Sequence, residues 1–259
     1  MAGFGNGWTA AAGLALVAAL SGCTTSGQQH GRAARTPSVL SACDGVADCH
    51  PDMSADLDGD GRPDEVAVVG HPIDDGVDGP YWSPDAAPTL RVATATTVLT
   101  YRVILAGPVF GHVVLGAAQV DGVAGDELLV GFADGAHGHP ATVVTDHGAG
   151  LRTLPSPDPY SGEPGAPEGS WGADSSIMSN LGWRCLPGGR VEEFIGVGGS
   201  AAAKPLTYTM WHQTWRWRDS KWWPVGRRWL RKHAPGDALT AEYHGWTGCG
   251  SFVAERPYE

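Results

Sequence analysis

The sequence predicts an all-β protein of about three to four antiparallel sheets, and three observations support this fold class. Glycine (38 residues) and proline (19) are abundant while only 17% of residues are charged, a composition typical of a chain with many turns. After the first 38 residues, short apolar runs alternate with Gly, Asp and Pro, without a long amphipathic helix pattern. Acidic pairs that precede apolar runs recur 62 and then 66 residues apart, at Asp64-Glu65, Asp126-Glu127 and Glu192-Glu193, which suggests one sheet per repeat.

The N-terminus carries a short apolar stretch, Ala10 to Leu20, which is too short to span a bilayer comfortably. It ends in Leu-Ser-Gly-Cys, with Cys23 last, and this resembles the lipobox of bacterial lipoproteins. The resemblance implies that residues 1–22 are a signal peptide and that Cys23 carries a lipid at the extracytoplasmic face of the cell membrane. A plain secretory signal and an uncleaved membrane helix are the alternatives.

The rest of the chain divides into a tether and one domain. Residues 23–38 combine the lipidated cysteine with a segment rich in Ser, Thr, Gln and Gly, typical of a flexible tether. Residues 39–259 are long enough for one sizeable domain, with repeat units expected near 55–117, 118–181 and 182–259. Within it, Ser156 to Gly182 is rich in Pro and Gly and is expected to be a long loop.

An acidic loop precedes the first apolar run. It places Asp56, Asp58, Asp60 and Asp64 at loop positions 1, 3, 5 and 9, and the carbonyl of Arg62 at position 7. Several carboxylates in one short loop repel one another unless a cation lies among them. Calcium suits such an all-oxygen, flexible set of ligands. The alternative is a solvated acidic turn that needs no metal.

The residues after this loop decide between two kinds of calcium site. Position 12 is Ala67, where an EF-hand has a bidentate Glu, and Glu65 to Val69 is a β-branched run typical of a strand. A calcium loop that leads into a buried strand resembles the FG-GAP or VCBS-type repeats of β-propellers, including integrin α-subunit blades. The resemblance implies a small or partial β-propeller-like stack with a structural calcium ion. The second loop, Val120 to Asp126, keeps only two carboxylates, so we expect a single calcium site.

Four cysteines remain after Cys23, and an even number in an oxidising compartment indicates two disulfides. Three pairings are possible. We favour a local Cys43–Cys49 bond and a long-range Cys185–Cys249 bond. A four-cysteine zinc site is the alternative, although no Cys-x-x-Cys pair is present.

Tryptophans cluster near the C-terminal end, where Tyr208 to Trp217 and Trp222 to Trp229 are expected to form two strands joined near Asp219-Ser220. Strand periodicity puts Trp211, Trp215 and Trp217 on one face. Such a row could stack on the sugar rings of a cell-wall polysaccharide. The alternative is that these rings pair in the sheet core.

Two further clusters carry candidate chemistry. The histidines at positions 137, 139 and 147 have the ligand type of a zinc site, but no fourth ligand is evident, and a hairpin loop is the alternative. The basic residues Arg227, Arg228, Arg231 and Lys232 could contact an anionic polymer, or protect a solvated edge strand.

Charge and motifs restrict the function classes. Residues 39–183 hold 4 basic and 21 acidic side chains, and this excess of acids disfavours nucleic acid as a partner. We find no Gly-x-Ser-x-Gly, His-Glu-x-x-His or phosphate-binding loop. We therefore expect a lipid-anchored surface binding or scaffold protein without catalysis, whose partner is a cell-wall polysaccharide or another envelope protein. An extracytoplasmic hydrolase acting on a cell-wall or secreted polymer is the alternative.

Overall fold

The computed structural model describes residues 40–76, 79–135, 138, 140–158, 165–175, 179–198, 208–233 and 245–250. These residues belong to one compact unit, Val39–Glu259, and form β-strands with one 3-10 helix, η1 (Pro84–Ala86), and no α-helix. The all-β prediction is confirmed. No helix in this part of the chain is long and apolar enough to cross a membrane. The predicted signal peptide, Cys23 and the tether lie outside the described residues.

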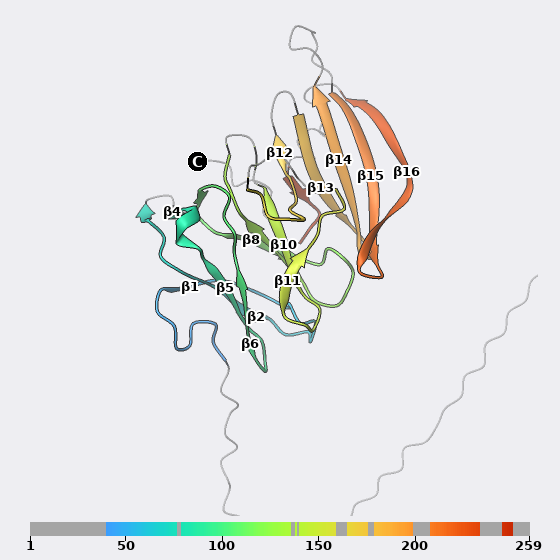
Figure 1. Ribbon diagram of the computed structural model, residues 1–259. Helices are drawn as coiled ribbons and strands as arrows, with labels where there is room; N and C mark the ends of the chain where they lie inside the picture. The colour runs from blue at the N-terminus through green and yellow to red at the C-terminus, as the bar shows by residue number, and fades with distance from the viewer. Residues whose placement is uncertain are drawn as a thin grey trace, which may run out of the picture. The chain divides into compact units, whose positions relative to one another are not determined.

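Three larger sheets stack side by side (Figure 1), and the first two contain four antiparallel strands each. The first sheet has the order β1 (Cys49–Ala55), β2 (Asp64–Val69), β5 (Thr89–Ala93), β6 (Val98–Arg102). The second sheet has the order β11 (Leu151–Leu154), β10 (Ala141–Asp146), β9 (Glu127–Gly131), β8 (Val114–Ala118). In these two sheets the acidic loop joins the first strand to the second, so each sheet begins one strand before its acidic pair.

The third sheet is the largest and has six strands. Its main path is β12 (Asp174–Ser175), β13 (Ser179–Leu186), β14 (Arg190–Gly198), β15 (Tyr208–Arg218), β16 (Lys221–His233). A last strand, β17 (Gly245–Thr247), adds parallel to β13. A small fourth sheet is formed by β3 (Asp74–Gly76), β4 (Gly79–Trp82) and β7 (Val109–Phe110).

The β15–β16 hairpin confirms the two predicted tryptophan-rich strands and their turn. Asp219 and Ser220 both have positive φ angles, 53° and 60°, as a two-residue hairpin turn requires. The pairing register shifts further along, where Trp229 lies opposite His212 but Val225 lies opposite Thr214. The intervening residues 226–228 therefore bulge out of β16.

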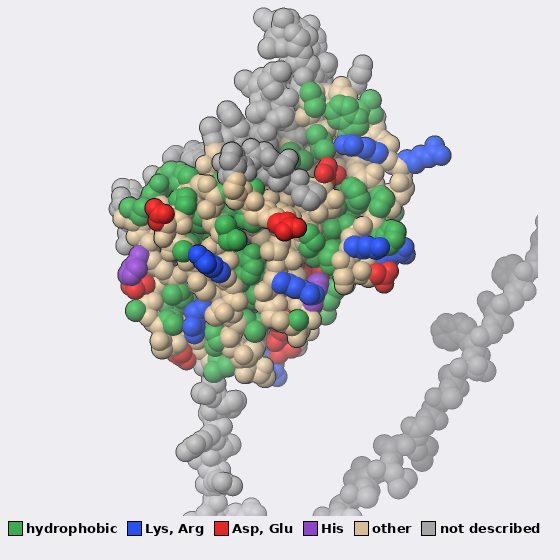
Figure 2. Space-filling model, viewed as in Figure 1, with side chains coloured by type: hydrophobic (Ala, Val, Ile, Leu, Met, Phe, Trp, Pro, Cys, Tyr) green, Lys and Arg blue, Asp and Glu red, His purple; other side chains and the backbone are tan. Residues whose placement is uncertain are grey.

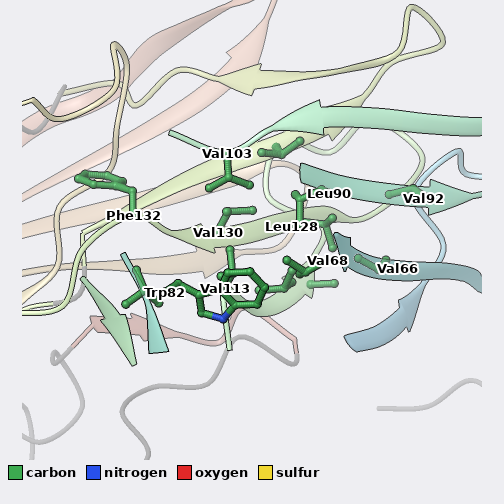
Figure 3. Packing of buried hydrophobic residues seen from close by; sticks show 14 of the residues in the cluster. Val66, Val68, Trp82, Leu90, Val92, Val103, Val113, Leu128, Val130 and Phe132 are labelled. Atoms are coloured by element: carbon green, nitrogen blue, oxygen red, sulfur yellow. The ribbon is translucent and has the colours of Figure 1, made fainter. Parts of the chain in front are cut away.

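Aliphatic side chains fill the space between the first and second sheets (Figure 3). They come from β2, β5 and β9, and the fully buried members include Val66, Val68, Leu90, Val92, Leu128 and Val130. Burying each such side chain contributes about 1.5–3 kcal/mol. Alternate residues of these strands face this core, because successive side chains of a strand point to opposite sides of the sheet.

Aromatic rings join the second sheet to the third. Trp171, Trp183 and Trp246 pack together, with ring centroids 4.6 to 6.2 Å apart, against Leu129 and Val143. The indole N–H of Trp171 donates to the carbonyl of Leu154 at 2.9 Å. The segment predicted to be a long loop thus supplies a completely buried core side chain.

Both predicted disulfides are present. Cys43–Cys49 closes a short loop directly before β1, and Cys185–Cys249 connects residues 64 positions apart in the sequence. The second bond holds the segment that contains β17 against β13.

Candidate metal centres

The turns that precede β2, β9 and β14 lie in a row, with the middle turn against each of the other two. We call them the first turn (residues 56–63), the second turn (residues 119–126) and the third turn (residues 187–189). A Cβ added to Gly125 would lie 2.4 Å from the carbonyl oxygen of Leu57, and one added to Gly122 would lie 2.6 Å from Gly189. Only glycine permits backbones to approach so closely. The acidic residues of neighbouring sheets are therefore brought into one region.

The first turn gathers three of the four predicted calcium-binding carboxylates. Asp56, Asp58 and Asp64 each offer an oxygen atom, and these atoms lie within 4.8 Å of one another. Asp64 is buried at the start of β2 and accepts the backbone N–H of Leu57 at 2.8 Å. This bond fixes one carboxylate, and the turn folds the other two around it.

Asp60, the fourth predicted ligand, is exposed and lies outside this group. One of its oxygens accepts the backbone N–H of Arg62 at 2.8 Å, and Asp56 accepts that of Gly61 at 2.9 Å. Gly59 and Gly61 have φ angles of +74° and +83°, which allow the chain to curl around the carboxylates.

The electrostatics of the first turn favour a cation. Burial raises the pKa of Asp64, the N–H of Leu57 opposes this, and the charges of Asp58 and Asp56 raise the pKa further. The Oδ1 atom of Asp56 is buried and has no hydrogen-bond partner. A bare buried carboxylate oxygen beside two other carboxylates fits a hard cation, which would supply both the ligand and the charge.

A residue of the second turn also faces this group. Asp126, which appeared in the sequence only as part of a repeat, donates its backbone N–H to the carbonyl of Asp56 at 2.6 Å. Burial raises the pKa of Asp126, and the nearby charge of Asp56 adds to this against a backbone hydrogen bond. Asp126 therefore brings another negative charge to the first turn.

A second group forms around the second turn. Asp121, Glu127 and His147 offer ligand atoms within 4.8 Å of one another. Glu127 is buried at the start of β9 and accepts the N–H of Val120, seven residues earlier, as Asp64 does with Leu57. Burial and the charge of Asp121 raise the pKa of Glu127 to about 8. Without a cation, the carboxyl group of Glu127 therefore retains a proton at neutral pH.

The third sheet also places a buried acid near the start of the strand that follows its turn, β14. Glu192 forms ion pairs with Arg184 and, at 3.1 Å, with His212. Burial acts to raise the pKa of Glu192, but the hydrogen bonds and charges of His212 and Arg184 outweigh it and lower the pKa. Here the chain itself supplies the positive charge.

The predicted tryptophan row lies within the third sheet. Trp215 and Trp217 are partly buried and pack against the aromatic core, and the indole N–H of Trp215 donates to Glu193 at 3.1 Å. Trp211 is also partly buried, between Ile195 and Leu230 in the sheet. Two of the three rings therefore serve the core, as the alternative interpretation expected. Of the predicted histidine group, His137 and His139 lie outside the described residues, and His147 joins Asp121 and Glu127.

Comparison of the chain with protein-family models, with curated proteins and with solved structures found no match. The resemblance to FG-GAP and VCBS-type repeats therefore stays a prediction. It rests on the acidic loop, on the strand that follows it and on the repeated acidic pairs.

Proposed function

We propose that this chain is a binding or scaffold protein held by a lipid on Cys23 at the extracytoplasmic face of a cell membrane, with a structural calcium ion in the first turn. The observation that supports the ion is the convergence of Asp56, Asp58 and Asp64 on a buried oxygen without a hydrogen-bond partner. Calcium takes six to eight oxygen ligands. Asp60, the carbonyl of Arg62 and water would complete such a set.

The ion would act on the contact between sheets. The first turn touches the second turn at Gly125, and Asp126 bonds to the backbone of Asp56. A cation among the carboxylates removes their mutual repulsion and restricts the turn, so it stabilises the first sheet against the second by mass action.

Two features support the extracytoplasmic location. The described cysteines form two disulfides, which persist in oxidising compartments. The lipobox resemblance at Cys23 supplies the anchor. Labelling cells with a radioactive fatty acid tests this part of the proposal: we expect label in the wild-type chain, and label in the Cys23→Ser chain would contradict it.

The burial of the acids whose pKa values are raised favours a binding function over hydrolysis. Glu127 and Glu193, whose pKa values are raised to about 8 and about 7, are only 1% and 3% exposed. A polymer could not reach either carboxyl group without a rearrangement of the sheets.

The edge of the third sheet offers a surface for a partner. Basic and hydrophobic side chains gather there (Figure 2), and on β16 they include Arg227, Arg228, Val225, Trp229 and Leu230. An exposed tryptophan beside cationic groups suits a cell-wall polysaccharide with anionic groups or another envelope protein.

Thermal unfolding of the full chain in calcium, magnesium or EDTA tests the calcium site. At 100 times the dissociation constant, calcium should stabilise the wild-type chain by about 2.7 kcal/mol, which raises Tm by roughly 5–10 °C for a domain of this size. The Asp58→Ala, Asp60→Ala double variant should lose this gain, whereas Asp85→Ala, an exposed acid on η1, should keep it. Equal calcium responses in all three chains would overturn the assignment.

A further inference from the structure

We propose that Asp121, Glu127 and His147 form a second cation site, distinct from the first turn, that takes a transition metal of the Zn²⁺ class. The three residues come from separate segments. Asp121 lies in the second turn, Glu127 is the first residue of β9, and His147 follows the last residue of β10. Their ligand atoms nevertheless lie within 4.8 Å of one another.

The strongest indication is an unusual contact between Asp121 and His147. The side chain of Asp121 is 0% exposed and that of His147 is 13% exposed, and Oδ2 of the one lies 2.8 Å from Nε2 of the other. The two atoms are at ion-pair distance and both are buried, but the contact does not have the geometry of a hydrogen bond and neither atom makes one elsewhere among the described residues. The imidazole N–H direction therefore does not point at the carboxylate. Two buried ligand atoms at ion-pair distance but without a hydrogen bond, beside the carboxylate of Glu127, are arranged as ligands of a shared cation.

Outer hydrogen bonds hold the two carboxylates in place. The other oxygen of Asp121 accepts the N–H of Val123 at 2.7 Å. Glu127 accepts the N–H of Val120, and the hydroxyl of Thr145 donates to its second oxygen at 3.4 Å. Such bonds orient metal ligands and commonly alter metal affinity 10- to 100-fold when they are lost.

The donor set distinguishes this site from the first turn. An imidazole nitrogen suits Zn²⁺ and related metals, whereas the all-oxygen first turn suits Ca²⁺. Three protein ligands leave a fourth tetrahedral position for water. Tetrahedral zinc with bonds of about 2.0–2.2 Å places its ligands roughly 3.3–3.6 Å apart. The ligand atoms, which lie within 4.8 Å of one another, therefore have to close by up to about 1.4 Å when the metal binds.

Arg152 competes with a metal ion, because it bonds to the ring of His147. Its guanidinium lies 3.0 Å from Nδ1 of His147, and because Arg can only donate, Nδ1 accepts and Nε2 carries the proton. A metal on Nε2 displaces that proton, and the neutral ring then carries its proton on Nδ1, where it opposes Arg152. Arg152 is exposed and can swing into solvent. Removing Arg152 should therefore raise the metal affinity.

Calorimetric titration of the full chain with Zn²⁺, together with the visible absorption of bound Co²⁺, tests the site. Asp121→Asn and His147→Ala should each lower Zn²⁺ affinity more than 10-fold, and Arg152→Ala should raise it several-fold. Metal-free melting curves check that the variants are folded. Unchanged Zn²⁺ affinity in Asp121→Asn and His147→Ala, or no Zn²⁺ binding by the wild-type chain, would overturn the proposal.

The two cation sites are separable in the same experiment. The Asp58→Ala, Asp60→Ala double variant should keep its Zn²⁺ affinity even though its calcium response is lost. If this variant lost Zn²⁺ binding while His147→Ala retained it, the zinc would belong to the first turn and the second site would be wrong. Displacement of Zn²⁺ by an equal concentration of Ca²⁺ would contradict the metal class.

Discussion

The first two sheets and the third sheet each bury an acid near the start of the strand that follows their turn, but they neutralise it differently. Asp64 and Glu127 have raised pKa values, because burial and neighbouring carboxylates disfavour their charge. Glu192 has a lowered pKa, because Arg184 and His212 outweigh its burial. Where the described chain places positive groups beside the acid, the acid is ionised. Where it gathers further acids instead, an external cation or a proton has to take that role.

This difference explains why metal sites are expected at two turns and not at the third. A buried carboxylate is costly unless it is paired and hydrogen-bonded. The third sheet meets that requirement with two side chains from its own strands, β13 and β15. The first and second turns leave buried oxygens on Asp56 and Asp121 without hydrogen bonds, although His147 lies at ion-pair distance, 2.8 Å, from Asp121.

The contact between the first and second turns can be broken at Gly125. An alanine there would place Cβ 2.4 Å from the carbonyl oxygen of Leu57, at a φ of +109°. We expect Gly125→Ala to lower the free energy of unfolding by about 4 kcal/mol, from the clash and the strained backbone together. Gly148→Ala is the matched control, because its φ is +78° but nothing lies within 4 Å. Urea unfolding measures both, and equal losses would show that the turns do not depend on close contact.

The internal counter-charge of the third sheet can be removed at Arg184. Arg184→Met keeps the aliphatic stem but leaves Glu192 with less positive charge, so we expect a loss of about 3 kcal/mol, tempered by the partial exposure of the arginine. Arg216→Met, an exposed position on β15, should change the stability by less than about 0.5 kcal/mol. Chemical unfolding at pH 7 compares the two. If Arg184→Met is as stable as the control, the ion pair does not neutralise Glu192.

Glu193 shows what burial does to an acid on the opposite face of the same strand. Burial and the charge of Asp158 raise the pKa of Glu193 to about 7 from an ordinary 4.5, although a hydrogen bond from Trp215 acts to lower it. The pKa of Glu193 is higher in the folded chain than in the unfolded chain, so folding is favoured when Glu193 is protonated. The contribution of Glu193 to stability is therefore complete below about pH 4.5 and is lost as the pH rises through about 7. We expect Glu193→Gln to flatten the fall in stability over this range by about 2 kcal/mol.

Urea unfolding at pH 4.5 and pH 7.5 measures the effect. Glu168→Gln is the control, because it removes an exposed carboxyl group and should follow the wild-type pH dependence. A Glu193→Gln chain with the same pH dependence as the wild type would show that Glu193 remains ionised in the fold.

Local features of the chain could be predicted because their causes lie within a few residues. The spacing of Asp56, Asp58 and Asp64 in one glycine-containing loop brings the carboxylates together wherever the loop is placed. The turn at Asp219-Ser220 follows from the same kind of short-range constraint. The even number of cysteines indicated two bonds, and both favoured pairs are present.

Only the tertiary structure could decide which distant residues complete each group. His147 follows Glu127 by 20 residues, and it reaches the second turn because β9 and β10 pair side by side. The sequence around Trp171 predicts a loop, and only the packing of the second sheet against the third makes this side chain part of the core. Asp126 faces the first turn because glycines let two backbones touch. The sequence by itself determined the loop, the strands and the disulfide chemistry, since short-range sterics and ligand spacing govern these. Packing between sheets decided which acid lies beside a cationic side chain and which is left for a metal ion.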